Sequence, residues 1–416
     1  MITTRTLDNG IRVIMEEMPQ VQSIAIGFWV RTGAIDETPK YAGISHFVEH
    51  MMFKGTENRS AKQISGDIEK IGASMNAFTG KEATCYYVKS VAENYRPAAD
   101  VIIDMLEHSL FEKKELDRER RVICEEIKMG EDQPDDLAHD KFVTSLFRGE
   151  KLSNSITGTR GSLERITHNV MKKYVEDQYT RDSMVISVAG RFDPDDVCEF
   201  FSGRFQSLKA KKPGLVQEKS EYVPAVHVVK KDIQQSHLCL GTRAITLDDE
   251  RSYAFQIMNS ILGGGMSSRL FQNIREERGL AYSVYSSLGA FSHDGYFEIY
   301  AGIAHDSLRA AIEGIREEIE KLADEPVSQE ELDSSREQLK SGYVFSQEST
   351  SARMIINGKN YLLLGRTFLP EEVLASYDKV TGEEIEQVKS MITDFDSYTA
   401  SLVTNRRADL KSMMRN

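Results

Sequence analysis

Cysteine is scarce in this chain, which has four among its 416 residues, and no two of them form a CxxC pair. This scarcity excludes a cysteine-rich zinc module and a disulfide framework. We therefore expect a reducing compartment, with each cysteine serving as a small buried side chain. Glycine, at 28, and proline, at 9, are not enriched, which excludes fibrous and low-complexity chains.

Long apolar runs and basic blocks are also missing. The most apolar stretch, residues 24–30, is far shorter than the roughly 20 residues that span a bilayer. The first residues lack the basic start and apolar core of a signal peptide. Lys and Arg number 52 against 65 Asp and Glu, so the net charge is −13, which argues against nucleic acid as the main partner. We expect a cytoplasmic protein that binds neither membrane nor nucleic acid.

What the chain does contain is an internal repeat. Four short matches recur in the same order at nearly one offset, among them Gln22-Ser23 with Gln235-Ser236 and Glu115-Leu116-Asp117 with Glu331-Leu332-Asp333. The repeat predicts two homologous domains of about 200 residues. We place them at residues 1–210 and 223–416, joined by a Lys-rich linker at 211–222 that lacks a periodic apolar face.

Each copy is predicted to run strand, helix, strand, long helical region, helix, strand. In the first copy the apolar periodicity indicates a strand at 24–30, helices at 42–53 and 60–71, a strand or hairpin at 75–91, and mostly helix over 94–130. Strands mixed with helix pairs in one unit favour an α+β fold, in which each domain is a mixed sheet with helices packed on one face.

The motif that carries chemistry is His46-Phe-Val-Glu49-His50. On a helix, positions i and i+4 lie on the same face, so both imidazoles can bind one metal ion. Two histidines with an acid favour zinc over calcium or magnesium. Glu49 is turned off the line between the two histidines, which suits a general base acting on a metal-bound water. The alternative is a helix with two incidental histidines, but polar groups in so apolar a helix are costly unless they are paired or bound to a metal.

A catalytic zinc ion usually has three protein ligands, so one must come from elsewhere. The helical stretch 117–131 offers Glu119, Glu125 and Glu126, and these residues by themselves leave the choice open. Glu119 and Glu126 are seven apart and share a helix face, whereas Glu125 is turned about 100° from Glu126. In the second copy the equivalent positions hold no metal-binding side chain, as expected if the candidate groups serve a single site.

HFVEH with the later Glu126 resembles the inverted zinc motif of the pitrilysin and insulysin-like metallopeptidases. The segments GISHFVEHMMFKGTENRSA, IGASMNAFTGKEATCYYVK and ERRVICEEI carry the resemblance, which extends over essentially the whole chain. They are most similar to the branch of the mitochondrial processing peptidase beta subunit and its bacterial single-unit relatives. The resemblance implies paired α+β domains of which only the first binds metal.

The resemblance also implies roles for individual residues. It makes His46, His50 and Glu126 the ligands of one Zn²⁺ per chain, with Glu49 as the general base and Glu119 as a supporting acid. It places Asn76 and Ala77 on an edge strand that pairs with the substrate backbone. Arg275 and Tyr282 in the second copy match a pair that contacts substrate.

Three functions follow as alternatives from the resemblance. The first is a zinc endopeptidase that cleaves unfolded or short peptides, acting as a homodimer that closes like a clamshell around a chamber. The second is a processing-type subunit that needs a different partner chain, and the third is a non-catalytic scaffold of the same fold. The intact motif speaks against the scaffold, and we expect the first, in a bacterial cytoplasm.

Overall fold

The computed structural model describes residues 2–210 and 221–415, so most of the predicted linker lies outside the described residues. The chain forms two compact units, and neither is contiguous in sequence. Unit 1 comprises Met1–Ile127, Asn154–Val216 and Val344–Leu369, and unit 2 comprises Lys128–Ser153, Gln217–Tyr343 and Pro370–Asn416. The predicted division at 1–210 and 223–416 therefore needs a correction, because each half of the chain contributes one segment to the unit built mainly from the other half.

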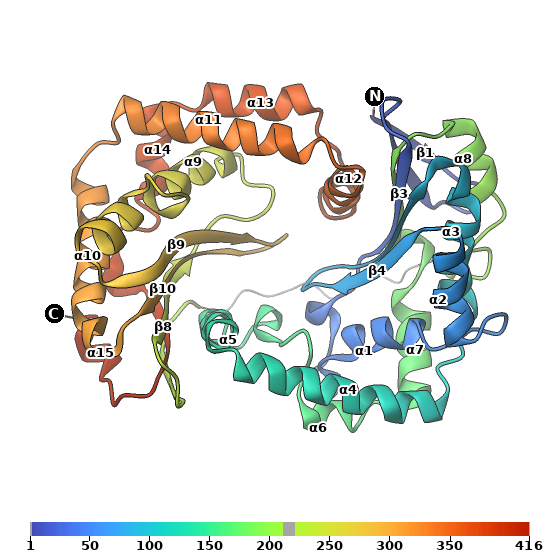
Figure 1. Cartoon of the computed structure of the whole chain (residues 1–416), viewed down its shortest axis with the longest axis horizontal. Coiled ribbons are helices and arrows are strands. Elements are labelled where there is room, and N and C mark those ends of the chain that lie inside the picture. Colours follow the sequence, from blue (N-terminus) through green and yellow to red (C-terminus); the bar gives the residue numbers. More distant parts are fainter. Residues whose placement is uncertain (1, 211–220, 416) are drawn as a thin grey trace. The chain divides into compact units, whose positions relative to one another are not determined.

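Unit 1 is built on a six-stranded sheet of order β1-β2-β6-β3-β5-β4. Figure 1 labels three of its strands, β1, β3 and β4. Its strands are β1 (Ile2–Thr6), β2 (Arg12–Glu17), β3 (Ser23–Val30), β4 (Ser74–Thr79), β5 (Thr84–Val91) and β6 (Met184–Gly190). Only β2 and β6 run parallel; the other neighbours are antiparallel. The predicted strand or hairpin at 75–91 is the β4–β5 hairpin, whereas the β1–β2 hairpin was not predicted.

Both faces of the central strand β3 are covered. Its Ile24, Ile26, Phe28 and Val30 belong to the main core, and the alternate residues Ala25 and Trp29 join a second cluster with Met354. The main core is supplied by α1 (Ile44–Met52), α2 (Ala61–Lys70), α3 (Tyr95–His108), α4 (Lys113–Asp132), α7 (His168–Gln178) and α8 (Pro194–Phe201). The second cluster is covered by α12 (Thr350–Leu364), which packs on β3 and β6. The α+β fold is confirmed, with helices on both faces of the sheet rather than one.

Unit 2 repeats this topology in a five-stranded sheet of order β7-β11-β8-β10-β9. The strands are β7 (Val226–Lys230), β8 (Ser236–Arg243), β9 (Ala281–Ala290), β10 (Gly295–Ile303) and β11 (Thr399–Thr404). Again only one pair of neighbours, β7 and β11, is parallel. Strand for strand this is the order β2-β6-β3-β5-β4 of unit 1, which agrees with the internal repeat found in the sequence.

Helices also cover both faces of the second sheet. Consecutive residues of a strand point to opposite faces. On β10, Glu298 bonds to His139 of α5 (Pro134–Leu146), whereas Ile299 pairs with Ser286, which contacts Gly263 of α9 (Ser252–Gly263). Helices α5 and α9 therefore lie on opposite faces. The unit is completed by α10 (Leu308–Asp324), α11 (Gln329–Ser346), α13 (Pro370–Lys379), α14 (Gly382–Lys389) and α15 (Leu410–Met413).

In unit 1 a buried ionic network holds α12 against the sheet. Glu16 of β2 is 4% exposed, and its Oε2 accepts hydrogen bonds from Arg353 Nε at 2.7 Å and from Asn357 Nδ2 at 2.6 Å. Arg353 also forms an ion pair with the other carboxylate oxygen. Because α12 comes from the second half of the sequence, this network fixes where a distant segment docks.

We expect Glu16→Gln to lower the free energy of unfolding by about 3–5 kcal/mol, because it leaves the buried Arg353 guanidinium without this carboxylate. The matched control is Glu17→Gln, which changes the neighbouring exposed residue of the same strand. Urea unfolding followed by circular dichroism measures both variants. Equal midpoints for the two would show that the network does not stabilise unit 1.

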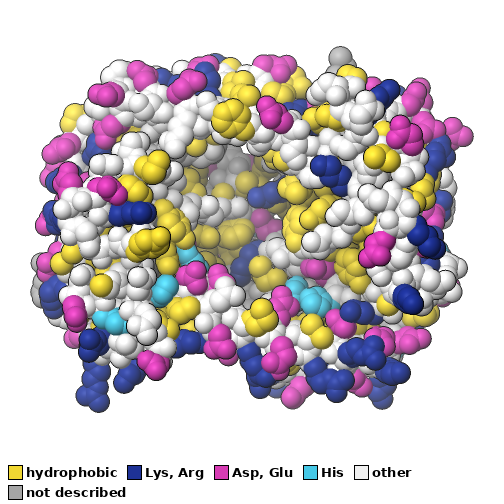
Figure 2. Space-filling view, viewed as in Figure 1, with side chains coloured by type: hydrophobic (Ala, Val, Ile, Leu, Met, Phe, Trp, Pro, Cys, Tyr) yellow, Lys and Arg dark blue, Asp and Glu magenta, His cyan; other side chains and the backbone are white. Residues whose placement is uncertain are grey.

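Lys and Arg side chains are interspersed with Asp and Glu side chains over the face shown in Figure 2. Among the described residues, no helix combines the length and apolar character needed to cross a bilayer.

Candidate metal centre

The helix that carries HFVEH begins at an unusual cap. Its N-cap residue, Gly43, has φ 88°, a left-handed conformation that favours glycine, and a Cβ there would lie 2.6 Å from the Thr157 carbonyl oxygen. Glycine offers no capping side chain, so the Glu37 carboxylate accepts hydrogen bonds from the Gly43 and Ser45 amides at 2.6 and 2.8 Å. Burial raises the pKa of Glu37 to about 7. An acid from the turn that precedes the helix thus replaces the usual N-cap side chain.

Apolar packing sets the orientation of α1. Phe47, Val48, Met51 and Met52 are all 0% exposed and belong to the main core of unit 1. This leaves His46, which is 8% exposed, and the half-buried His50 on the remaining side of the helix. Their rings lie 4.6 Å apart between centroids, as expected for side chains one helical turn apart.

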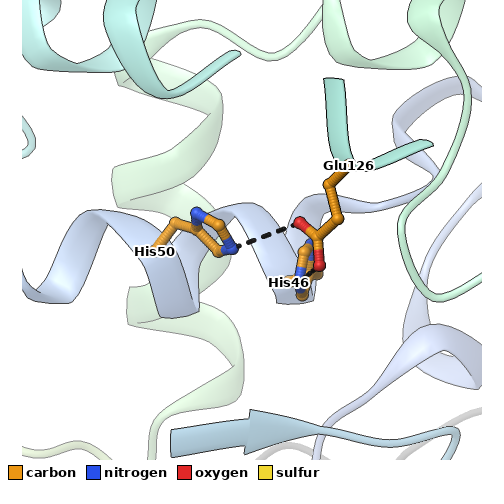
Figure 3. Close-up of side chains that lie close together, drawn as sticks. All are labelled: His46, His50 and Glu126. Carbon is orange, nitrogen blue, oxygen red and sulfur yellow. Dashed lines mark ion pairs between the residues drawn. The ribbon is translucent and has the colours of Figure 1, made fainter. Parts of the chain in front are cut away.

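The third group comes from α4. Glu126 Oε1 lies 3.7 Å from His46 Nε2, and Glu126 Oε2 lies 3.6 Å from His50 Nε2. Figure 3 shows the three side chains pointing toward one another from the two helices. One ligand atom from each residue lies within 4.8 Å of the other two. Of the three acids that the sequence left open, only Glu126 completes this group among the described residues.

The spacing of these atoms fits a metal ion better than hydrogen bonding. Separations of 3.6 and 3.7 Å are too long for N–H···O bonds. Two ligands of one tetrahedral zinc ion, each about 2.0–2.1 Å from it, lie roughly 3.3 Å apart. Moreover, Glu126 Oε2, which faces His50, is buried without a hydrogen-bond partner. Two imidazole nitrogens and a carboxylate oxygen are a donor set that zinc prefers, so the residues present fit a zinc ion.

Burial and a neighbouring carboxylate set the states of the two candidate histidine ligands. Burial, and then the neighbouring His50, lower the pKa of His46 to about 4, so its imidazole is neutral at neutral pH. Glu119 is 3% exposed, and its Oε2 lies 3.4 Å from His50 Nδ1 while its Oε1 pairs with Lys54 at 2.8 Å. A carboxylate on the far nitrogen of a histidine fixes the ring and directs the other nitrogen outward. Glu119 therefore orients His50, the position implied for a supporting acid.

Glu49 stays out of the three-residue group. Its Oε2 accepts a hydrogen bond from Thr79 Oγ1 at 2.5 Å. Burial raises the pKa of Glu49, and the hydrogen bond from Thr79 opposes that effect. Thr79 is the last residue of β4, so this bond joins the helix that carries the candidate base to the edge strand of the sheet.

The predicted substrate-binding residues fall into two places. Asn76 and Ala77 lie on β4, the outermost strand of the first sheet, and the Ala77 amide donates to Asn76 Oδ1 at 2.8 Å. Arg275 and Tyr282 lie in unit 2, where the Arg275 guanidinium stacks 5.2 Å from the Tyr282 ring and 4.7 Å from the Phe271 ring. Tyr282 is 72% exposed, so the pair presents an aromatic surface.

Two supporting residues, Glu37 and Thr79, are not predicted by the sequence pattern. Glu37 caps α1 from a preceding turn, and no local pattern marks it, because its role depends on how that turn folds back. Thr79 had a weak signal: it lies three residues after Asn76 on the strand already chosen as the substrate edge.

The two halves of the chain match models of one peptidase family. The family model described as Insulinase (Peptidase family M16) matches residues 12–160, and the one described as Peptidase M16 inactive domain matches residues 165–339. The chain is 40% identical to the uncharacterized zinc protease YmxG of Bacillus subtilis, over 97% of this chain and 98% of that protein. It is 36% identical to an uncharacterized zinc protease of Rickettsia felis, over 95% of this chain and 96% of that protein.

Solved structures share the fold at lower identity. A protease from Helicobacter pylori superposes with a TM-score of 0.90 at 21% identity, covering 97% of this chain and 99% of that one. A protein from Pseudomonas fluorescens described as a peptidase M16 inactive domain has a TM-score of 0.91 at 18% identity, with 98% of both chains covered. On the sequence matches, which span both halves of the chain, this protein belongs to the insulinase family of peptidases, peptidase family M16.

Proposed function

We propose that this chain is a zinc-dependent endopeptidase that hydrolyses unfolded or short peptides bound in an extended conformation. The observation that carries the proposal is the convergence of His46, His50 and Glu126 at metal-ligand spacing, with Glu49 on the same helix but outside the ligand group. The names of the Bacillus and Rickettsia relatives, both zinc proteases, support the same reading.

The chemistry divides between the ion and the chain. A zinc ion held by the two histidines and Glu126 would lower the pKa of a water molecule and polarise the scissile carbonyl. Glu49 accepts a proton from the attacking water and passes it to the leaving amine as the C–N bond breaks. Thr79 holds one oxygen of Glu49, which fixes the direction of the carboxylate. Glu119 holds the ring of His50.

The substrate is proposed to add a strand to the sheet at β4. This strand pairs with β5 on one side and is the outermost strand on the other, so its free edge can accept an extended peptide. Because Thr79 of the same strand bonds Glu49, a peptide aligned on β4 would run past the candidate base. Pairing through main-chain hydrogen bonds requires an extended peptide backbone and depends little on which side chains the peptide carries. It therefore favours unfolded substrates and a loose sequence preference. Asn76 and Ala77 lie at that edge, and Arg275 with Tyr282 are proposed to contact substrate as well.

The assembly and location remain predictions from the family resemblance. We propose that two copies form a homodimer that encloses the substrate, in the cytoplasm of a bacterium. Size-exclusion chromatography with light scattering measures the mass in solution and tests the dimer directly.

The proposed function is tested with one substrate in two states. The substrate is a small disulfide-bonded protein, offered in its folded form and, after reduction and alkylation, in an unfolded form. We expect cleavage of the unfolded form only, loss of cleavage with a zinc chelator and recovery when zinc is added back. A purified chain that binds zinc but cleaves neither form would favour the processing-type subunit. A chain that binds no zinc would favour the scaffold.

A further inference from the structure

Unit 2 contains a second group of potential metal ligands, far in sequence from HFVEH. It consists of His139 on α5, Cys239 on β8 and Glu298 on β10, and one ligand atom from each lies within 4.8 Å of the other two. Cys239 is 0% exposed and Glu298 is 2% exposed, while the His139 side chain is 29% exposed and leaves a way in from solvent. The mechanism proposed above uses none of these three residues.

The contacts on the histidine ring define what the group can do. Nδ1 of His139 lies 2.8 Å from Glu298 Oε1 and 3.7 Å from Cys239 Sγ. Its other nitrogen, Nε2, lies 3.2 Å from the Tyr285 hydroxyl, and the ring stacks on Tyr300 at 5.0 Å between centroids. The ring is therefore held on both sides, and one nitrogen faces the thiol and the carboxylate together.

This arrangement does not suit a nucleophilic cysteine. A Cys–His–acid triad needs the thiol on one ring nitrogen and the acid on the other, whereas here both face Nδ1. Burial, and then the charge of Glu298, raise the pKa of the Cys239 thiol, which opposes formation of a free thiolate. A reactive cysteine requires the opposite environment.

The spacing does suit a metal ion. A sulfur and a nitrogen bound to one tetrahedral zinc ion lie roughly 3.5 Å apart, close to the Cys239–His139 separation. The His139–Glu298 pair would have to open by about half an ångström to reach ligand spacing. Either a hydrogen or a metal ion must lie between Nδ1 and the carboxylate, because the two atoms would otherwise present only lone pairs to each other. If the Tyr285 hydroxyl accepts the Nε2 proton, the lone pair of Nδ1 is directed at the site.

The surrounding charge favours a cation. Burial by itself would lower the pKa of His139, but the hydrogen bond and charge of Glu298, with Asp135 and Asp136 nearby, raise it overall. The same acids raise the pKa of Tyr285 to about 12, after the larger effect of burial. The group thus lies in a negative, partly desolvated environment.

We propose that His139, Cys239 and Glu298 form a second metal site, for a divalent transition-metal ion of the zinc type. On binding, the metal–sulfur bond forms and the S–H bond of Cys239 breaks, with its proton leaving to solvent. The metal ion also displaces the hydrogen that lies between His139 Nδ1 and Glu298, which leaves to solvent or is replaced by a hydrogen on Nε2. Because His139 comes from α5 and the other two ligands from β8 and β10, the bound ion would clamp α5 to the second sheet. The proposal is independent of the peptidase function, since it uses none of the residues of the first site.

The test is a titration of the metal-free full-length chain with Co²⁺, followed by absorption in the near ultraviolet. A cobalt–thiolate charge-transfer band requires a cysteine ligand, and the His46, His50 and Glu126 group contains none. We expect the band in the parent chain and in Glu126→Ala, which disables the first site. We expect Cys239→Ser to abolish it. Glu298→Gln removes a proposed ligand, so it should weaken Co²⁺ binding by at least the roughly tenfold that the loss of a residue supporting a ligand costs.

The matched control is Cys198→Ser, which changes a half-buried cysteine whose sulfur neighbours the sulfur of Met15. It should keep the band. A second measurement, the rise in melting temperature with added Co²⁺, should be smaller in Glu298→Gln than in the parent chain. Absence of the band in the parent, or its survival in Cys239→Ser, would overturn the proposal. In that case the cluster would be only an internal His–Glu ion pair that docks α5.

Discussion

Glu49→Gln is expected to lower the rate of peptide hydrolysis by about 10²–10⁴-fold, the usual contribution of a general base. Glutamine keeps the size of the side chain and can still accept the hydrogen bond from Thr79, but it cannot take a proton from water. Because Glu49 lies outside the three-residue ligand group, the zinc content should be unchanged. Steady-state cleavage of an unstructured peptide and metal analysis of the same preparation measure both quantities.

The control is Glu57→Gln, which removes an exposed acid shortly after the same helix and should leave both quantities at the parental level. Full activity of Glu49→Gln would remove this residue from the chemistry. Loss of zinc together with activity would instead show that Glu49 is a ligand and that the division between base and ligands is incorrect.

Three acids on α4 are expected to respond differently to alanine substitution. Glu126→Ala should abolish tight zinc binding, because it removes the one member of the proposed three-ligand group that lies outside α1. Glu119→Ala should weaken zinc affinity by roughly 10–100-fold, the typical cost of losing the partner that orients a ligand histidine. Glu125→Ala should leave zinc affinity unchanged, since its helix face is turned about 100° from that of Glu126.

Competition with a chromophoric zinc chelator measures all three affinities under one set of conditions. Glu125→Ala is the matched control, because it removes the same side chain from the adjacent position of the same helix. The prediction is tested by the order of zinc affinity, which should be lowest in Glu126→Ala, intermediate in Glu119→Ala and parental in Glu125→Ala. If Glu119→Ala lost more affinity than Glu126→Ala, the two roles assigned here would be exchanged.

The contacts of Glu126 and Glu119 with His50 explain why the loss of zinc affinity should be larger for Glu126→Ala than for Glu119→Ala. Both acids approach His50, Glu126 at Nε2 and Glu119 at Nδ1. Glu126 is the one that also lies near His46, whereas Glu119 forms an ion pair with Lys54. One acid therefore faces the metal position, and the other faces away from it behind the ring.

Local sequence was sufficient to predict several parts of this protein. The i, i+4 spacing of His46 and His50 determines a shared helix face whatever surrounds the helix. The period-two apolar pattern of residues 24–30 determines a strand, and the internal matches indicate a duplicated unit, now seen as a repeated strand order. The assignment of Glu126 rather than Glu119 as the third ligand required the family resemblance, because two residues seven apart lie on the same face of a helix.

Only the tertiary structure decided the features that depend on contacts between distant segments. It assigns residues 128–153 to unit 2 and residues 344–369 to unit 1, so that α5 and α12 dock on sheets formed mainly by the other half of the chain. It also joins Glu37 to the start of α1, Thr79 to Glu49, and His139 to Cys239 and Glu298. The physical reason is the same in each case: a helix with an apolar stripe is predicted by its own periodicity, but the surface that covers the stripe, and the side chains brought together there, are set by packing across the whole chain.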